Sequence, residues 1–172
     1  SPDQLKRFIH EALSLEADYI LIDLGSGIHP HTLDFFNVAG RSFIITTPEP
    51  TAIQNTYAFY KAALLRRLEV VIMQHPWLKK IVQRAALSKG SSRIKSLGNL
   101  LEMLKELDYE MSREVMTHLE GLQAPLIINR AYPDDETQVV DALKQICSQT
   151  LQFELKHTLT IPEDKTLRSA IR

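Results

Sequence analysis

Short, almost unbroken apolar runs alternate with amphipathic stretches along most of this chain. The runs occupy residues 19–22, 42–47 and 125–129, and apolar residues alternate with polar ones over 151–155. Strands covered by helices on both faces of a parallel sheet have this composition. Helices between parallel strands favour right-handed crossovers. The pattern therefore predicts an α/β fold, with a three-layer, mostly parallel sheet flanked by helices.

Amphipathic helices are expected before and between these strands, at residues 4–16, 31–39, 52–67 and 136–149. Residues 68–122 interrupt the alternation, since leucines recur at helical spacing from Leu97 to Leu107 and a further helix is expected at 111–120. We therefore expect one domain over residues 1–172, with a helical insertion at 68–122.

The bulk properties narrow the class of protein. The formal net charge is −1, so the chain as a whole does not attract nucleic acid or an anionic membrane. Cys147 is the single cysteine and lies at helical spacing from apolar neighbours, which predicts a packed core thiol. No apolar run approaches the roughly 20 residues of a membrane span. Together with the absence of a signal peptide, these features lead us to expect a cytoplasmic protein.

The first apolar run ends at Asp23, and Gly25 and Gly27 follow. Ligands of parallel sheets bind beyond the carboxyl ends of the strands, and the two glycines allow the backbone to approach a ligand closely. A carboxylate in this position can hold Mg²⁺, because this cation prefers oxygen ligands and retains several waters. From these residues alone, an Asp that only caps the turn is an equally good interpretation.

Four segments extend this observation. They read YILIDLGSGI at 19–28, FIITTPEPTA at 43–52, LIINR at 126–130 and IPEDKTLRSA at 161–170. In this order they resemble the MinD/ParA family of P-loop ATPases, and best match its flagellar-regulator and MinD-like branch. The resemblance covers roughly residues 18–65 and 124–170. It leaves residues 66–123 unexplained.

The resemblance implies a role for each matching residue, with ATP and Mg²⁺ as cofactors. Asp23, in the Walker B segment, would hold the catalytic Mg²⁺, and Asn129 would bind the adenine base. Arg130 either belongs to this site or forms a salt bridge at the sheet edge. The remaining positions would respond to the γ-phosphate (Gly25, Gly27), shape the rim of the site (Pro48, Glu49), or border the base or a partner subunit (Pro162, Asp164).

One part of the family pattern is missing. No Gly-rich loop with Lys and Ser/Thr occurs in the sequence, although that loop supplies the N–H groups and the charge that phosphoryl transfer requires. We therefore expect the C-terminal part of such an ATPase, which alone binds ATP poorly and is inactive. A strand left without its neighbour would then pair with another copy, giving a homodimer, or rearrange.

Residues 66–95 carry eight basic residues and one acid, whereas six acids follow between 102 and 120. Three interpretations stay open: helices of opposite charge packed together, a surface for a partner protein, or a patch for DNA or a membrane. His29 and His31 lack a third metal ligand nearby in the sequence, so a solvent-exposed loop is favoured over a metal site.

The leading hypothesis is an ATP-dependent dimerisation switch that positions flagella, division sites or chromosomes. The alternative is a non-catalytic interaction module that keeps the P-loop fold without using nucleotide. A third possibility is another P-loop relative, similar to dethiobiotin synthetase or to cobyrinate-amidating enzymes. The turn TPEPT at 47–51 fits that third possibility less well.

Overall fold

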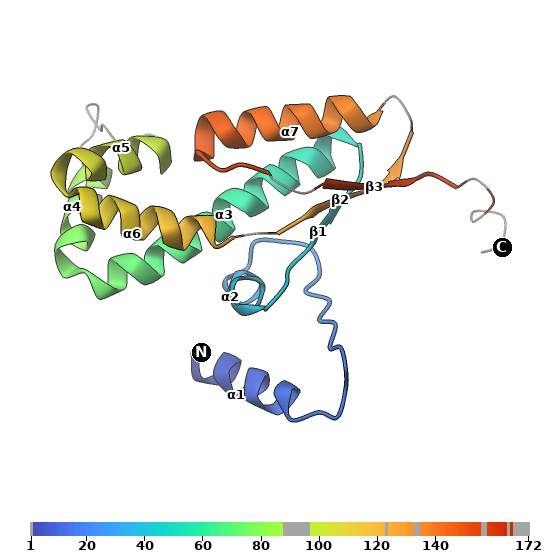
Figure 1. The fold of residues 1–172 in the computed structure, drawn as a ribbon, viewed down its shortest axis with the longest axis horizontal. Coiled ribbons are helices and arrows are strands. Elements are labelled where there is room, and N and C mark those ends of the chain that lie inside the picture. The colour runs from blue at the N-terminus through green and yellow to red at the C-terminus, as the bar shows by residue number, and fades with distance from the viewer. Residues whose placement is uncertain are drawn as a thin grey trace.

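The structure is a computed structural model that describes residues 2–87, 97–122, 124–132, 135–155, 158–164 and 166. Helices and strands alternate along these residues (Figure 1). In chain order the elements are α1 (Pro2–Leu13), α2 (Pro30–Val38), β1 (Ile44–Thr46), α3 (Pro50–Gln74), α4 (Pro76–Leu87), α5 (Leu97–Leu107), α6 (Tyr109–Glu120), β2 (Leu126–Ala131), α7 (Asp135–Leu151) and β3 (Thr158–Pro162). The expected mixed α/β class is confirmed.

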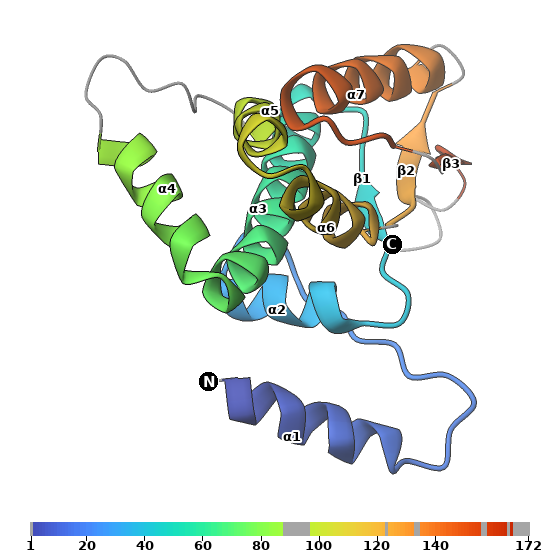
Figure 2. The ribbon, with the colours of Figure 1, turned by 60° about the vertical axis from the view of Figure 1, so that its left-hand side comes forward.

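The three strands form one parallel sheet in the order β1-β2-β3. Because each connection steps to the next strand in the same direction, right-handed crossovers place α3 and α7 on the same face of the sheet. Accordingly, α3 contacts β1, α7 contacts β2, and the two helices contact each other. Figure 1 shows them above the strands, and Figure 2 shows α5 and α6 against α3.

The core lies between the sheet and these two helices. Leu126 and Ile128 of β2 are fully buried, as are Leu143 and Cys147 of α7. Burial raises the pKa of the Cys147 thiol to about 11. The prediction of a packed core thiol is therefore confirmed.

The opposite face of the sheet is open. Ile45 and Leu159 both align with Ile127 of β2, and they are 66% and 58% exposed. Ile161 of β3, on the same face, is 49% exposed. The third layer of the predicted fold is thus not formed by the described residues, which build a helix layer on one face only.

The strand expected at residues 19–22 is not formed. This segment is extended, with Tyr19 89% and Leu21 93% exposed. A strand needs a neighbour to bond its N–H and C=O groups, and the described residues provide none for this segment. The apolar composition was therefore correctly recognised, but it does not produce a strand without a partner.

The prediction of a strand at residues 151–155 is also wrong. Helix α7 continues to Leu151, and the third strand of the sheet lies further on, at Thr158–Pro162. Leu143, Cys147 and Leu151 recur every four residues and are buried on one helix face. This helical period outweighs the short alternation that suggested a strand.

The described residues of the expected helical insertion form helices joined by short turns. Its predicted start at residue 68 falls inside α3, which runs without a break to Gln74. Helix α6 packs on α3 and α5, Arg67 Nε donates to the His118 carbonyl (3.1 Å) and His75 Nε2 lies 3.2 Å from Glu114 Oε1. No helix in the described part of the chain is long and apolar enough to cross a membrane.

Candidate functional site

The first turn at the carboxyl edge of the sheet joins β1 to α3. Thr46 ends β1, and its Oγ1 lies 2.8 Å from Thr56 Oγ1 on the second turn of α3, which fixes the helix against the strand. Between them, Pro48 and Glu49 form the turn, and Glu49 is the N-cap of α3 without a side-chain capping bond. Pro50 begins the helix because its fixed φ suits the first helical position. The Glu49 carboxylate therefore remains at the edge of the sheet.

The second turn follows β2. Asn129 is aligned with Ile161 of β3 and is half-buried on the open face of the sheet. The next residue, Arg130, has a φ of 61°, and the register shifts there so that Ala131 aligns with Pro162. Residues other than glycine, Asn and Asp seldom adopt this left-handed backbone conformation. It directs the end of β2 and its Arg130 side chain toward the end of β3.

An ion pair joins these two strand ends. Arg130 Nε lies 2.9 Å from Glu163 Oε2, and the Glu163 side chain is only 6% exposed. The Glu163 N–H also donates to the Ala131 carbonyl (3.0 Å). The pair raises the pKa of Arg130, chiefly through the hydrogen bond to Glu163 and in smaller part through Glu49. The sheet-edge salt bridge, left open as an interpretation of Arg130, is therefore present.

Glu49 belongs to the same electrostatic cluster. Its pKa is lowered, first by a hydrogen bond from the Thr47 side chain, then by its own backbone N–H, and also by the charge of Arg130. The Asp164 carboxylate, two residues beyond Pro162, accepts bonds from Thr166 N and Thr166 Oγ1 at 2.8 and 2.6 Å. Residues expected around the base and at the rim thus follow three neighbouring strands at one edge.

The residues expected near Mg²⁺ and the γ-phosphate, Asp23, Gly25 and Gly27, lie in a separate turn that follows no strand of the sheet. Asp23 Oδ1 accepts a bond from the Gly25 N–H (3.1 Å), and Gly25 and Gly27 have φ values of 67° and 123°. Asp23 is exposed, and no hydrogen bond or ion pair in the described residues joins it to Glu49 or Asn129. The observed turn corresponds to the interpretation of Asp23 as a capping residue.

The described residues form no cluster of several metal-ion ligands. Among the described residues, no three His, Cys, Asp or Glu side chains converge in a way that would hold a metal ion. This also leaves His29 and His31, whose rings lie 5.4 Å apart, without a third ligand in that part of the chain. The magnesium role of Asp23 stays a prediction, and no step of phosphoryl transfer follows from this geometry.

Two residues of the edge were not identified from the sequence. Glu163 occupies the variable position of the Ile-Pro-x-Asp segment, so its bond to Arg130 is visible only once β2 and β3 are aligned. Thr56 lies at helical spacing from the turn, and its contact with Thr46 had no signal beyond two small polar residues in apolar surroundings. Both residues hold the edge together.

A stretch of 60 residues is 40% identical to the flagellum site-determining protein YlxH of Helicobacter pylori (strain ATCC 700392 / 26695). The match covers 34% of this chain and 20% of that protein, so the chain spans about a fifth of the relative's length. No family model and no solved structure matches. The likeness indicates a partial relation to a flagellar protein of MinD/ParA type.

Proposed function

We propose that this chain is part of a MinD/ParA-like switch protein that dimerises with ATP and positions cellular machinery, such as flagella, division sites or chromosomes, in the cytoplasm. The observation that carries the proposal is the carboxyl edge of the sheet, where Asn129 lies beside the paired ends of β2 and β3. The likeness to a flagellum site-determining protein supports the positioning role.

The proposed contact to the base depends on the Asn129 amide. An amide N–H can donate to N7 of adenine while the amide oxygen accepts from its N6 amino group, and guanine cannot match this bidentate pair because it presents two acceptors, N7 and O6. Asn129 is half-buried and directly precedes Arg130, whose ion pair with Glu163 joins the ends of β2 and β3. A well-ordered strand end binds a ligand more tightly than a mobile one, because less conformational entropy is lost on binding.

Titration with nucleosides tests this contact. In ¹H–¹⁵N spectra of this chain, adenosine should shift residues at the ends of β2 and β3, and guanosine should bind about tenfold more weakly. ATP with Mg²⁺ should bind about as well as adenosine, because the Gly-rich loop that would hold the phosphates does not occur in the sequence.

Asn129→Ala should remove the preference for adenosine, whereas Asn55→Ala, an exposed amide on α3, should leave it unchanged. If Asn129→Ala still bound adenosine with saturation and with the same preference over guanosine, the base would bind at a different place from Asn129. Absence of any saturable shift with adenosine would refute a nucleotide function for these residues.

The open sheet face supports the homodimer in this proposal. Ile45, Leu159 and Ile161 form a row of exposed apolar side chains across one face, and β1 has a free edge in the described residues. Such edges and faces favour association. Light scattering should show a concentration-dependent dimer that Ile45→Lys weakens, with Leu107→Lys, also exposed, as the matched control. A monomer over the whole concentration range contradicts this part.

A second candidate is a non-catalytic interaction module. It is favoured by two bonds already made within the chain, Arg130 to Glu163 and Asp23 to the Gly25 N–H, because these groups are then engaged without nucleotide. The partner-protein surface expected over 68–122 belongs to either candidate. A DNA or membrane patch at the basic stretch 66–95 has weaker support, since Arg66 is paired with Asp34 and Glu69. Lys89, Arg93 and Lys95 lie outside the described residues.

A further inference from the structure

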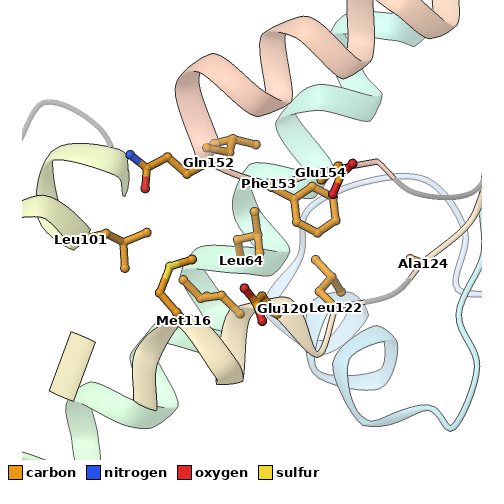
Figure 3. A pocket seen from close by; sticks show the side chains of 11 residues that line it. Leu64, Leu101, Met116, Glu120, Leu122, Ala124, Gln152, Phe153 and Glu154 are labelled. Atoms are coloured by element: carbon orange, nitrogen blue, oxygen red, sulfur yellow. The ribbon is translucent and has the colours of Figure 1, made fainter. Parts of the chain in front are cut away.

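A cavity of about 200 Å³ lies between α3, α5, α6 and the segment that follows α7. Its floor is apolar and includes Leu64, Leu101 and Met116, while Phe153 closes one side (Figure 3). Leu64 and Leu101 are 1% and 4% exposed, so the floor belongs to the core. Ala124, which precedes β2, also lines the cavity, whereas the candidate nucleotide edge follows the other end of that strand.

The size of the cavity limits what can enter it. Pockets for drug-sized ligands occupy about 300–1,000 Å³, which is more than this cavity offers. An apolar cavity of about 150 Å³ is enough to admit one benzene ring. One branched aliphatic or aromatic side chain therefore matches the space, and a nucleotide does not.

The mouth of the cavity is acidic. Glu120 and Glu154 line it and are exposed, and Gln152 is the third polar residue there. Neither carboxylate forms a salt bridge in the described residues. No Lys or Arg is among the residues that line this cavity in the part of the chain that the structure describes. A bound cation would thus meet two carboxylates at the rim.

The carboxyl ends of two helices add to the negative potential at the mouth of the cavity. Helix α6 ends at Glu120 and α7 ends at Leu151, and both residues line the cavity. The carboxyl end of a helix carries a partial negative charge that favours cations. Arg67 offsets part of it through its bond to the His118 carbonyl, but it does not line the cavity.

We propose that this cavity binds a partner protein through a peptide segment that places one branched or aromatic side chain in the apolar floor and a neighbouring lysine or arginine between Glu120 and Glu154. The proposal identifies a site and a partner chemistry for the partner-protein surface proposed over 68–122. It does not require nucleotide binding, so its failure and that of the adenosine experiment are independent.

The test uses capped dipeptides as probes in ¹H–¹⁵N titrations. N-acetyl-leucyl-lysine amide should give saturable shifts at the residues around the cavity. N-acetyl-leucyl-glutamine amide, which lacks the cation, should bind about threefold more weakly for each carboxylate engaged. N-acetyl-seryl-lysine amide, which lacks the apolar group, should give no saturable shift. Isopentylamine binding as tightly as the leucyl-lysine probe would indicate a small-amine site and overturn the peptide assignment.

Variants separate charge from shape. Combined Glu120→Gln and Glu154→Gln should make the lysine and glutamine probes equal, whereas Glu106→Gln, an exposed carboxylate on α5 away from the cavity, should not. Met116→Trp should fill the cavity and abolish binding, with Met103→Trp, half-buried but outside the cavity, as the control for folding. Equal affinity for both probes in the unaltered chain, or binding that persists in Met116→Trp, would overturn the proposal.

Discussion

The hydroxyl of Tyr60 connects α3 to the start of the central strand, and removing it isolates one buried hydrogen bond. Tyr60 is fully buried, and its hydroxyl donates to the Ala124 carbonyl at 3.0 Å. Burial raises the pKa of this hydroxyl above its ordinary value, as expected in apolar surroundings. Tyr60→Phe keeps the ring, including its contact with Phe153 at a centroid distance of 5.4 Å. The substitution therefore removes the bond with little change in packing.

The expected loss in the free energy of unfolding of Tyr60→Phe depends on the hydrogen-bond acceptor that remains in the core. Ala124 is 6% exposed, so its carbonyl would stay buried without its donor. An unsatisfied buried group costs about 1–3 kcal/mol. For a chain of this length, each kcal/mol lowers the melting temperature by about 2–4 °C. We expect urea unfolding to give a loss of about 1.5 kcal/mol without a change in the m-value.

Tyr57→Phe provides the comparison. The Tyr57 hydroxyl lies 3.0 Å from Thr150 Oγ1, at a half-buried position where water can replace the lost partner. Its loss should cost less than about 1 kcal/mol. If Tyr60→Phe costs no more than Tyr57→Phe, the buried bond to Ala124 does not stabilise the junction of α3 and β2, and the reasoning is refuted.

Three further substitutions or conditions test other parts of the structure. The Asp108 carboxylate accepts the Met111 N–H at 3.0 Å as the N-cap of α6, so Asp108→Ala should cost about 1 kcal/mol by thermal unfolding and Asp108→Asn much less. Cys147 is fully buried with its pKa raised to about 11, so a thiol reagent at pH 8 should react only after unfolding. Because the unfolded thiol ionises first, at its ordinary pKa, this group's contribution to stability should fall as the pH rises from that value towards 11. Gln152 has a φ of 50°, so Gln152→Gly should raise the free energy of unfolding by about 0.5–1 kcal/mol, measured in urea.

Sequence patterns identified β1 and β2, which pair with each other within the described chain, but they did not identify β3. The run at 125–129 became β2, the middle of the sheet, and its residues Leu126 and Ile128 are fully buried between neighbours. The equally apolar run at 19–22 stayed exposed. The apolar composition of a segment indicates that it can be buried. Whether it forms a strand also depends on a second segment to pair with, which the composition does not identify. For this reason the same signal gave one correct strand and one wrong one.

The site shows the same division. Parallel strands bring their carboxyl ends to one edge, so the juxtaposition of the Glu49 turn and Asn129 followed from the predicted strands. Pro162 was placed beside them by the family resemblance. The Arg130–Glu163 bond did not, because it depends on the left-handed backbone of Arg130 and the register shift beside it. Pairing between charged residues 33 positions apart becomes visible only when the register is known.

The central strand separates the two proposed binding sites. Ala124 borders the cavity, Asn129 stands at the nucleotide edge, and the five steps between them span roughly 17 Å of extended chain. Effects of substitutions at such separations usually add, unless a two-state element links them. The Tyr60 bond and the Phe153 ring join the cavity to α3, whose first turn follows Glu49. Helix α3 is therefore the element through which a peptide in the cavity would influence the nucleotide edge. Unchanged adenosine affinity in the presence of the leucyl-lysine probe would show that α3 acts as a rigid support and that the two sites are independent.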